Sequence, residues 1–142
     1  MLANRLFDNT PLPVMNKSMD AAMLRSRTIS NNIANVTTPG YKRVEVSFED
    51  ELRRAMDGPR LRGVNTRENH MHLGGGDISS VKARAYRPND PTLPSGVNNV
   101  DIDTEMAKLA ETQIMFNYAV NMSQGVYRKL NASIQARPIP LH

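Results

Sequence analysis

Two stripes of apolar residues, one near each end of the chain, constrain the fold more than any other feature of the sequence. The first, the N-terminal stripe, lies in a segment from about residue 14 to residue 36 and repeats in steps of four and three residues. Its seven positions are Met15, Met19, Ala22, Ser26, Ile29, Ile33 and Val36, and all except Ser26 are apolar. This spacing lines one face of an α-helix. The segment is therefore predicted to be a helix with a narrow packing face.

The second stripe, the C-terminal stripe, lies in a longer segment from Asp101 to about Ala136. Its ten positions are Ile102, Met106, Leu109, Gln113, Phe116, Val120, Ser123, Tyr127, Leu130 and Ile134. All of them except Gln113 and Ser123 are apolar or aromatic. The Asp101 carboxylate is expected to cap the first turn of this helix. Two prolines, Pro138 and Pro140, are expected to end it, and Gly125 to weaken it by about 1 kcal/mol relative to alanine.

The middle of the chain, residues 42–99, contains most of the glycines and no long periodic run. One short helix is predicted at residues 47–57, with Ser47 as its cap and Phe48 and Leu52 on one face. From residue 60 to residue 99 we expect at most short strands, such as Ser80 to Tyr86.

The sequence thus divides into an N-terminal helix with a turn motif (residues 1–41), the irregular middle (42–99) and a C-terminal helix (100–137). The predicted fold is mainly α, with the long N- and C-terminal helices packed as a coiled-coil-like hairpin. The middle is predicted to hold the short helix and little β-structure.

Each stripe is narrower than the apolar face of a helix inside a globular core, and suits a helix that packs against one or two others. The partner helix can belong to the same chain or to another copy. Our hypothesis is that the terminal helices are marginal in the monomer and become stable when neighbouring subunits cover their other faces. Apolar residues outside the stripes could serve these contacts: Met23, Leu24, Ala34, Met115, Tyr118 and Met122. The alternative is that the helix pair is only the core of a small helical domain.

Composition argues against several other classes of protein. The chain has no cysteine, so it has neither disulfides nor thiolate metal sites. Its net charge of +4 is spread along the chain, with acidic residues among the basic ones, which does not favour nucleic-acid binding. No run of apolar residues is as long as a membrane helix requires, so we expect no membrane insertion. The first residues lack the basic and apolar blocks of a signal peptide, so any export is expected to use another route.

An enzyme would have to be built on His70 and His72, with Asp77 nearby, because this spacing can place two imidazoles on one side of a strand for a metal ion. No third histidine lies near, and the run Gly74 to Gly76 lacks the surrounding pattern of a phosphate-binding loop. We therefore expect no enzyme, metal or cofactor. A small metal-dependent enzyme is the alternative from a different class.

A turn motif follows the N-terminal stripe in the run Ser30-Asn31-Asn32-Ile33-Ala34-Asn35-Val36-Thr37-Thr38-Pro39-Gly40-Tyr41-Lys42. Thr38 precedes a proline and is pushed out of the helical region, while Gly40 can supply the positive φ of a type II turn. Asn35 is expected either to adopt a left-handed conformation or to bond the local backbone. The candidate site residues of this motif are Asn32, Asn35, Thr38, Pro39, Gly40 and Tyr41.

This run resembles the N-terminal signature of the flagellar rod and hook axial proteins. The run from Asn98 to Gln113 is similar to the C-terminal half of the family member that builds the proximal rod, as are Phe48-Glu49-Asp50 and the run from Thr66 to His70. The resemblance covers roughly residues 14–134 in broken blocks and is weakest from 74 to 95. It implies a structural subunit of the bacterial flagellar basal-body rod that assembles by packing its terminal helices and transmits torque across the periplasm. Another rod member, such as FlgC, is the alternative.

The resemblance also implies partners and a location. The implied partners are copies of the chain itself, FliE, FlgC and other rod subunits, and the basal-body ring. It further implies export by the flagellar type III apparatus without a cleaved signal peptide, and a final place in the periplasmic rod.

Overall fold

The computed structural model describes residues 10–57 and 78–135. The histidine pair, Asp77, the Gly74–Gly76 run and the C-terminal prolines lie outside these residues. The elements, in chain order, are α2 (Leu12–Ala34), β1 (Glu45–Ser47), α3 (Glu49–Asp57), a 3-10 turn η1 (Ile78–Ser80), β2 (Arg84–Tyr86) and α4 (Ile102–Ile134). No helix within the described ranges combines the length and the apolar character that crossing a membrane requires.

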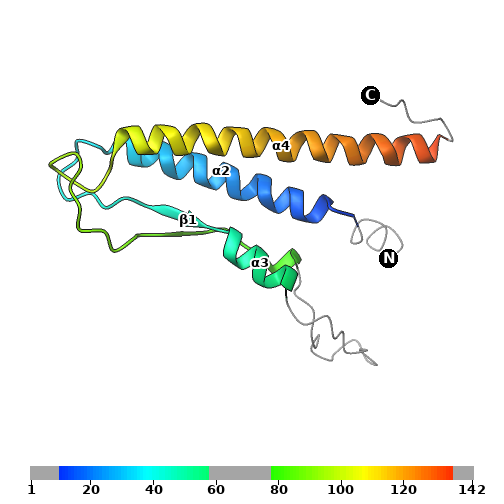
Figure 1. Ribbon diagram of the computed structural model, residues 1–142, viewed down its shortest axis with the longest axis horizontal. Helices are drawn as coiled ribbons and strands as arrows, with labels where there is room; N and C mark the ends of the chain where they lie inside the picture. The colour runs from blue at the N-terminus through cyan, green and yellow to red at the C-terminus, as the bar shows by residue number, and fades with distance from the viewer. Residues whose placement is uncertain (1–9, 58–77, 136–142) are drawn as a thin grey trace.

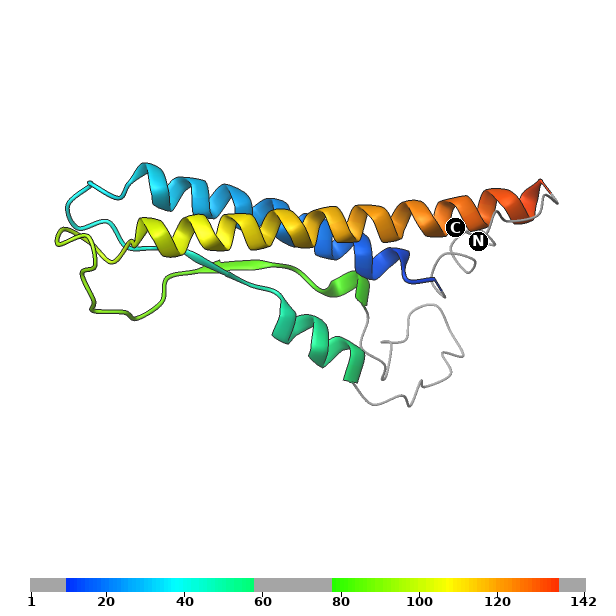
Figure 2. The same ribbon diagram turned by 45° about the horizontal axis from the view of Figure 1, so that its top comes forward.

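Helices α2 and α4 lie side by side and run in opposite directions (Figures 1 and 2). This confirms the predicted hairpin of the two terminal helices. Helix α2 begins at Leu12 and ends at Ala34, each about two residues before the predicted limit. It can begin this early because Pro13 stands in the first turn, where a helix has no use for the missing N–H.

Helix α4 has 33 residues against the 23 of α2 and extends beyond its start (Figure 1). Asn32 bonds Glu105 across the pair, so Leu12, twenty residues earlier, lies opposite about residue 125. The last part of α4, residues 126–134, is therefore not covered by α2, and we call it the overhang.

The predicted cap of α4 is confirmed. The Asp101 carboxylate accepts hydrogen bonds from the N–H groups of Asp103, at 3.0 Å, and Thr104, at 3.5 Å. The Thr104 hydroxyl also donates to this carboxylate at 2.8 Å, and these bonds hold the pKa of Asp101 below its usual value. The sequence therefore fixes where the second long helix begins.

The two strands form an antiparallel ribbon in which Glu45 stands opposite Tyr86 and Ser47 opposite Arg84. Helix α3 begins at Glu49, two residues later than predicted, because Ser47 belongs to β1 and does not cap it. The predicted strand from Ser80 to Tyr86 forms only at its end, after η1.

A small apolar core attaches the ribbon and α3 to α2. It consists of Ala21, Phe48 and Val81, all buried, with Leu52 and Ala83 packed around them. The ribbon is attached to α4 by an ion pair between Glu45 and Lys108. The middle of the chain therefore lies against one face of the helix hairpin and leaves other faces of α4 uncovered (Figure 2).

Candidate assembly surface and helix corner

The turn motif forms the corner where the chain leaves α2. The Tyr41 N–H donates to the Thr38 carbonyl at 3.3 Å, and Gly40 has a φ of 70°, as the predicted type II turn requires. Asn35 has a φ of −107°, so it is not left-handed. It bonds the local backbone instead, because its amide donates to the Asn31 carbonyl at 2.8 Å.

Asn32 is fully buried at this corner and uses its whole hydrogen-bonding capacity. Its amide nitrogen donates to the Val44 carbonyl and to Glu105 Oε2, both at 2.8 Å. Its amide oxygen accepts from the Val44 N–H at 3.0 Å and from the Tyr41 hydroxyl at 3.1 Å. One side chain of the turn motif thus joins α2, the segment before β1 and α4.

Asn98 holds the same corner from the other side. Its amide nitrogen donates to the carbonyls of Asn35, Val36 and Thr38 at 3.0, 2.9 and 3.0 Å. These three carbonyls belong to the cap residue Asn35 and to the turn that follows α2, so Asn98 holds the chain where it leaves the helix. The Asn98 oxygen accepts from the Val100 N–H at 2.9 Å, just before α4 begins.

Sequence reasoning assigned no role to Asn98 or Asn99, which entered only through the family resemblance. Asn99 accepts a hydrogen bond from the Arg43 N–H at 2.7 Å. The only sequence signal for these roles is a pair of asparagines directly before a helix cap. The elements that they bond are some sixty residues away, so spacing alone could not reveal them.

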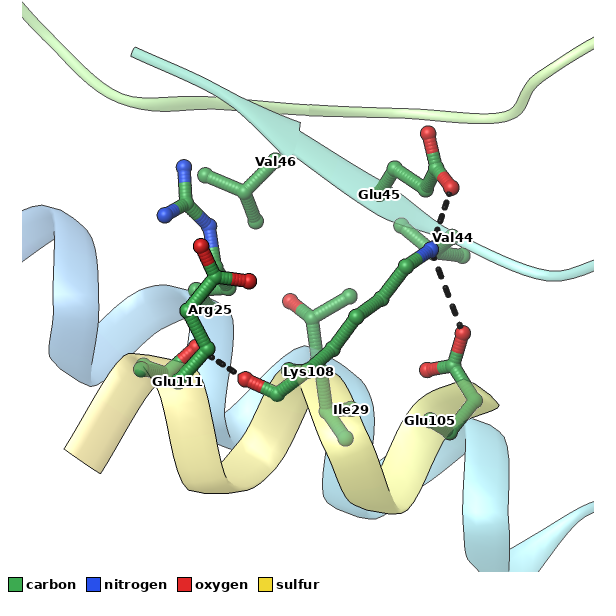
Figure 3. Close-up of a pocket in the computed structure, with 10 residues that line it drawn as sticks. Arg25, Ile29, Val44, Glu45, Val46, Glu105, Lys108 and Glu111 are labelled. Atoms are coloured by element: carbon green, nitrogen blue, oxygen red, sulfur yellow. Dashed lines mark hydrogen bonds and ion pairs between the residues drawn. The ribbon is translucent and has the colours of Figure 1, made fainter. Parts of the chain in front are cut away.

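A charged cleft lies beside the corner, between α2, β1 and α4 (Figure 3). Lys108 reaches from α4 toward β1, with its ammonium 2.9 Å from Glu45 Oε1 and 3.8 Å from Glu105 Oε1. Partial burial raises the pKa of Glu45, but the bonds from Lys108 and from the Tyr86 hydroxyl outweigh it and leave that pKa lowered. The same bond to Glu45 raises the pKa of Tyr86.

The structure places the whole N-terminal stripe on the packed side of α2. Ala22 and Ile29 are buried, and the other five members are half-buried: Met15, Met19, Ser26, Ile33 and Val36. Ala22 and Ser26 line one cleft together with Phe116 of α4. Positions beside the stripe are buried as well, among them Ala21 and Thr28, because α2 also contacts the ribbon.

The C-terminal stripe is divided by the structure. Ser123 is buried, and four other members are half-buried: Leu109, Phe116, Val120 and Leu130. The remaining five are exposed on the described chain: Ile102, Met106, Gln113, Tyr127 and Ile134. The buried positions of α4 are Glu105, Thr112, Ala119 and Ser123, so the line that faces α2 lies partly one residue before the predicted one.

Large apolar side chains also lie exposed elsewhere on α4, and we call Ile114, Met115, Tyr118 and Met122 the α4 patch. Ile114 and Tyr118, which are four residues apart on one side of the helix, are 70% and 66% exposed. Met122 continues the four-residue spacing of Ile114 and Tyr118 and is 42% exposed.

Within residues 10–57 and 78–135, no group of three or more histidine, cysteine, aspartate or glutamate residues could hold a metal ion. The metal candidates of the sequence, His70, His72 and Asp77, lie outside these ranges. The arrangement that the structure does show is suited to packing against other helices.

The chain is similar to known proteins over most of its length. The family profile described as "Flagella basal body rod protein" matches residues 19–42, which hold most of α2 and the turn motif. The chain is 33% identical to the flagellar basal body rod protein FlgB of Borreliella burgdorferi over 117 residues, covering 80% of this chain and 87% of that protein. It is 34% identical to FlgB of Borrelia hermsii, with 82% and 90% covered, and 32% identical to FlgB of Bacillus subtilis, with 88% and 92% covered. The chain therefore belongs to the FlgB family of flagellar basal body rod proteins.

Proposed function

We propose that this structural rod subunit joins its neighbours through the uncovered faces of α2 and α4, and that it belongs to the proximal part of the rod. The observation that carries the proposal is the α4 patch, which the hairpin leaves exposed. Burying a large apolar side chain in a neighbouring molecule stabilises the contact by about 1.5–3 kcal/mol. Several such residues on one helix supply enough for a stable assembly.

The two stripes have different parts in this proposal. Their packed members, such as Ile29, Leu109 and Phe116, hold the hairpin together. The exposed members, such as Met106 and Ile134, contact neighbouring subunits. The corner built on Asn32 and the turn motif fixes how the two helices are presented to those neighbours.

The names of the relatives support a place in the flagellar basal body. We infer that the partners are copies of the chain, FliE, FlgC and other rod subunits, and the basal-body ring. We also infer export by the flagellar type III apparatus without a cleaved signal peptide, followed by assembly in the periplasmic rod. The proposed task is the mechanical transmission of torque, with no catalysis and no cofactor.

The proposal includes a division of labour along the chain. Residues 1–41 and 100–137 form the part that packs in the axis of the rod, and residues 42–99 form a separate part carried beside it. The Lys108–Glu45 ion pair, which joins α4 to the ribbon, supports this division, because the small apolar core of the middle packs on α2 rather than on α4.

A substitution in the α4 patch tests the proposal. Ile114→Glu places a charge at a side chain that is 70% exposed, so we expect circular dichroism and the urea midpoint to change little. We expect the variant to be missing from purified basal bodies and its cells not to swim, because the charge would be buried in the assembly. Gln124→Glu, at an exposed polar position of the same helix, is the matched control and should assemble. Normal incorporation of Ile114→Glu would refute the role of the patch.

A further inference from the structure

Beside the cleft at the corner lies one buried carboxylate oxygen that accepts no hydrogen bond. Glu105 is only 1% exposed, and its Oε2 accepts from Asn32. Its Oε1 is buried without a hydrogen-bond partner, and the Lys108 ammonium stays 3.8 Å away. A buried oxygen without a hydrogen bond carries a desolvation cost, which a donor that reaches it from the cleft would offset.

The cations that line the cleft are already engaged. Arg25 is bonded to Glu49 at 2.6 and 2.8 Å, and Lys108 is bonded to Glu45 at 2.9 Å. Glu111, which also lines the cleft, forms no ion pair with any residue in the described ranges. Glu45 also pairs with Arg43 at 3.4 Å, so Glu111 is the lining carboxylate with no cation paired to it within the described ranges (Figure 3).

The size of the cleft indicates what kind of group would enter it. Its volume is about 220 Å³, whereas sites for small molecules usually have about 300–1,000 Å³. A single side chain from another protein molecule suits this space better than a metabolite. Guanidinium is the best match for a carboxylate cluster, because its planar set of donors can bond two carboxylates at once.

A basic group stands at the far end of the same helix. Arg128 and Lys129 lie exposed in the overhang, and neither forms an ion pair with the residues that the structure describes. Seventeen residues separate Glu111 from Arg128, which is about 26 Å along a helix. Arg128 therefore cannot reach the cleft of its own chain, but it belongs to the overhang, beyond the start of α2, where a second copy can meet it.

We infer that Arg128 in the overhang of one copy enters the corner cleft of the next copy, where its guanidinium donates to Glu111 and to the free oxygen of Glu105. The inference rests on the proposed function and adds a specific subunit contact to it. Because the two surfaces differ, the contact is head to tail, and its repetition builds a ring or an open helical array of copies. Two copies that run parallel would be offset by about 26 Å along the helix axis.

A charge exchange tests this contact in the assembled rod. Glu111→Arg and Arg128→Glu should each lower the amount of the subunit in purified basal bodies at least about tenfold, which corresponds to 1.4 kcal/mol. The double variant restores the pair with its charges exchanged and should recover most of the wild-type amount. Asp20→Arg combined with Arg128→Glu is the matched control, because Asp20 is exposed on α2 away from the cleft, and it should show no recovery.

A second measurement locates the contact directly. In basal bodies that contain the Arg128→Lys variant, a carbodiimide should form an amide between position 128 and Glu111, detected by mass spectrometry of the cross-linked peptides. The bond must join two copies, because these positions lie too far apart within one helix. Glu111→Gln should remove it. No recovery in the double variant, or no such peptide from assembled basal bodies, would overturn the inference, while wild-type chain absent from basal bodies would instead overturn the proposed function.

Discussion

Amide side chains, rather than apolar ones, hold the corner between the two long helices. Asn32→Ala would leave Glu105 and both backbone groups of Val44 without the partners that they have now. Since each buried polar group left unpaired costs about 1–3 kcal/mol, we expect a loss of stability on the order of 3 kcal/mol or more. Urea unfolding of the purified chain measures this. Asn31→Ala is the control, because that neighbouring side chain is exposed, and an equal loss in both variants would contradict the role of Asn32.

At the scale of elements, the ribbon is joined to α4 by charge, and this makes the attachment sensitive to acid. The pKa of Glu45 is lowered below its ordinary value of 4.5 in the folded chain. Its contribution to stability is therefore complete above that value and is lost as the pH falls through the lowered one. We expect thermal stability to fall between about pH 5 and pH 3 in the wild type, and Glu45→Gln to remove part of this fall. Asp20→Asn, which changes an exposed carboxylate, should leave the pH dependence intact, and an unchanged profile for Glu45→Gln would refute the attachment.

The sequence predicted the elements better than it predicted the face of α4. The two long helices, the Asp101 cap and the Gly40 turn were predictable because caps, turns and periodicity are local signals, and the rod family was predictable because two runs of the sequence resemble it. The face of α4 was harder, since polar or small residues such as Glu105 and Thr112 are buried against α2 while Ile134 is 81% exposed. An apolar pattern reports burial of any kind. It cannot separate burial within the chain from the burial in neighbouring copies that we propose.

For the whole molecule, the unequal lengths of the helices predict unequal protection. The overhang has no α2 beside it, so its backbone hydrogen bonds open without disturbing the rest of the pair. In the isolated chain we expect amide hydrogens of residues 126–134 to exchange much faster than those of residues 105–123. In assembled basal bodies we expect the overhang to become protected. Equal exchange of the two segments in the free chain would show that the overhang does not depend on neighbours.

The corner also has a mechanical consequence. The Asn98 side chain donates to three carbonyls directly after α2 and accepts from the N–H of Val100, one residue from the cap of α4. Hydrogen bonds are directional and weaken steeply when they are misaligned, whereas apolar contacts slide at little cost. A rotation applied to one helix thus reaches the other through these short bonds, and the connecting loop bears little strain. We expect the hairpin to rotate as one rigid body, so that the flexibility of the rod lies at the contacts between its subunits.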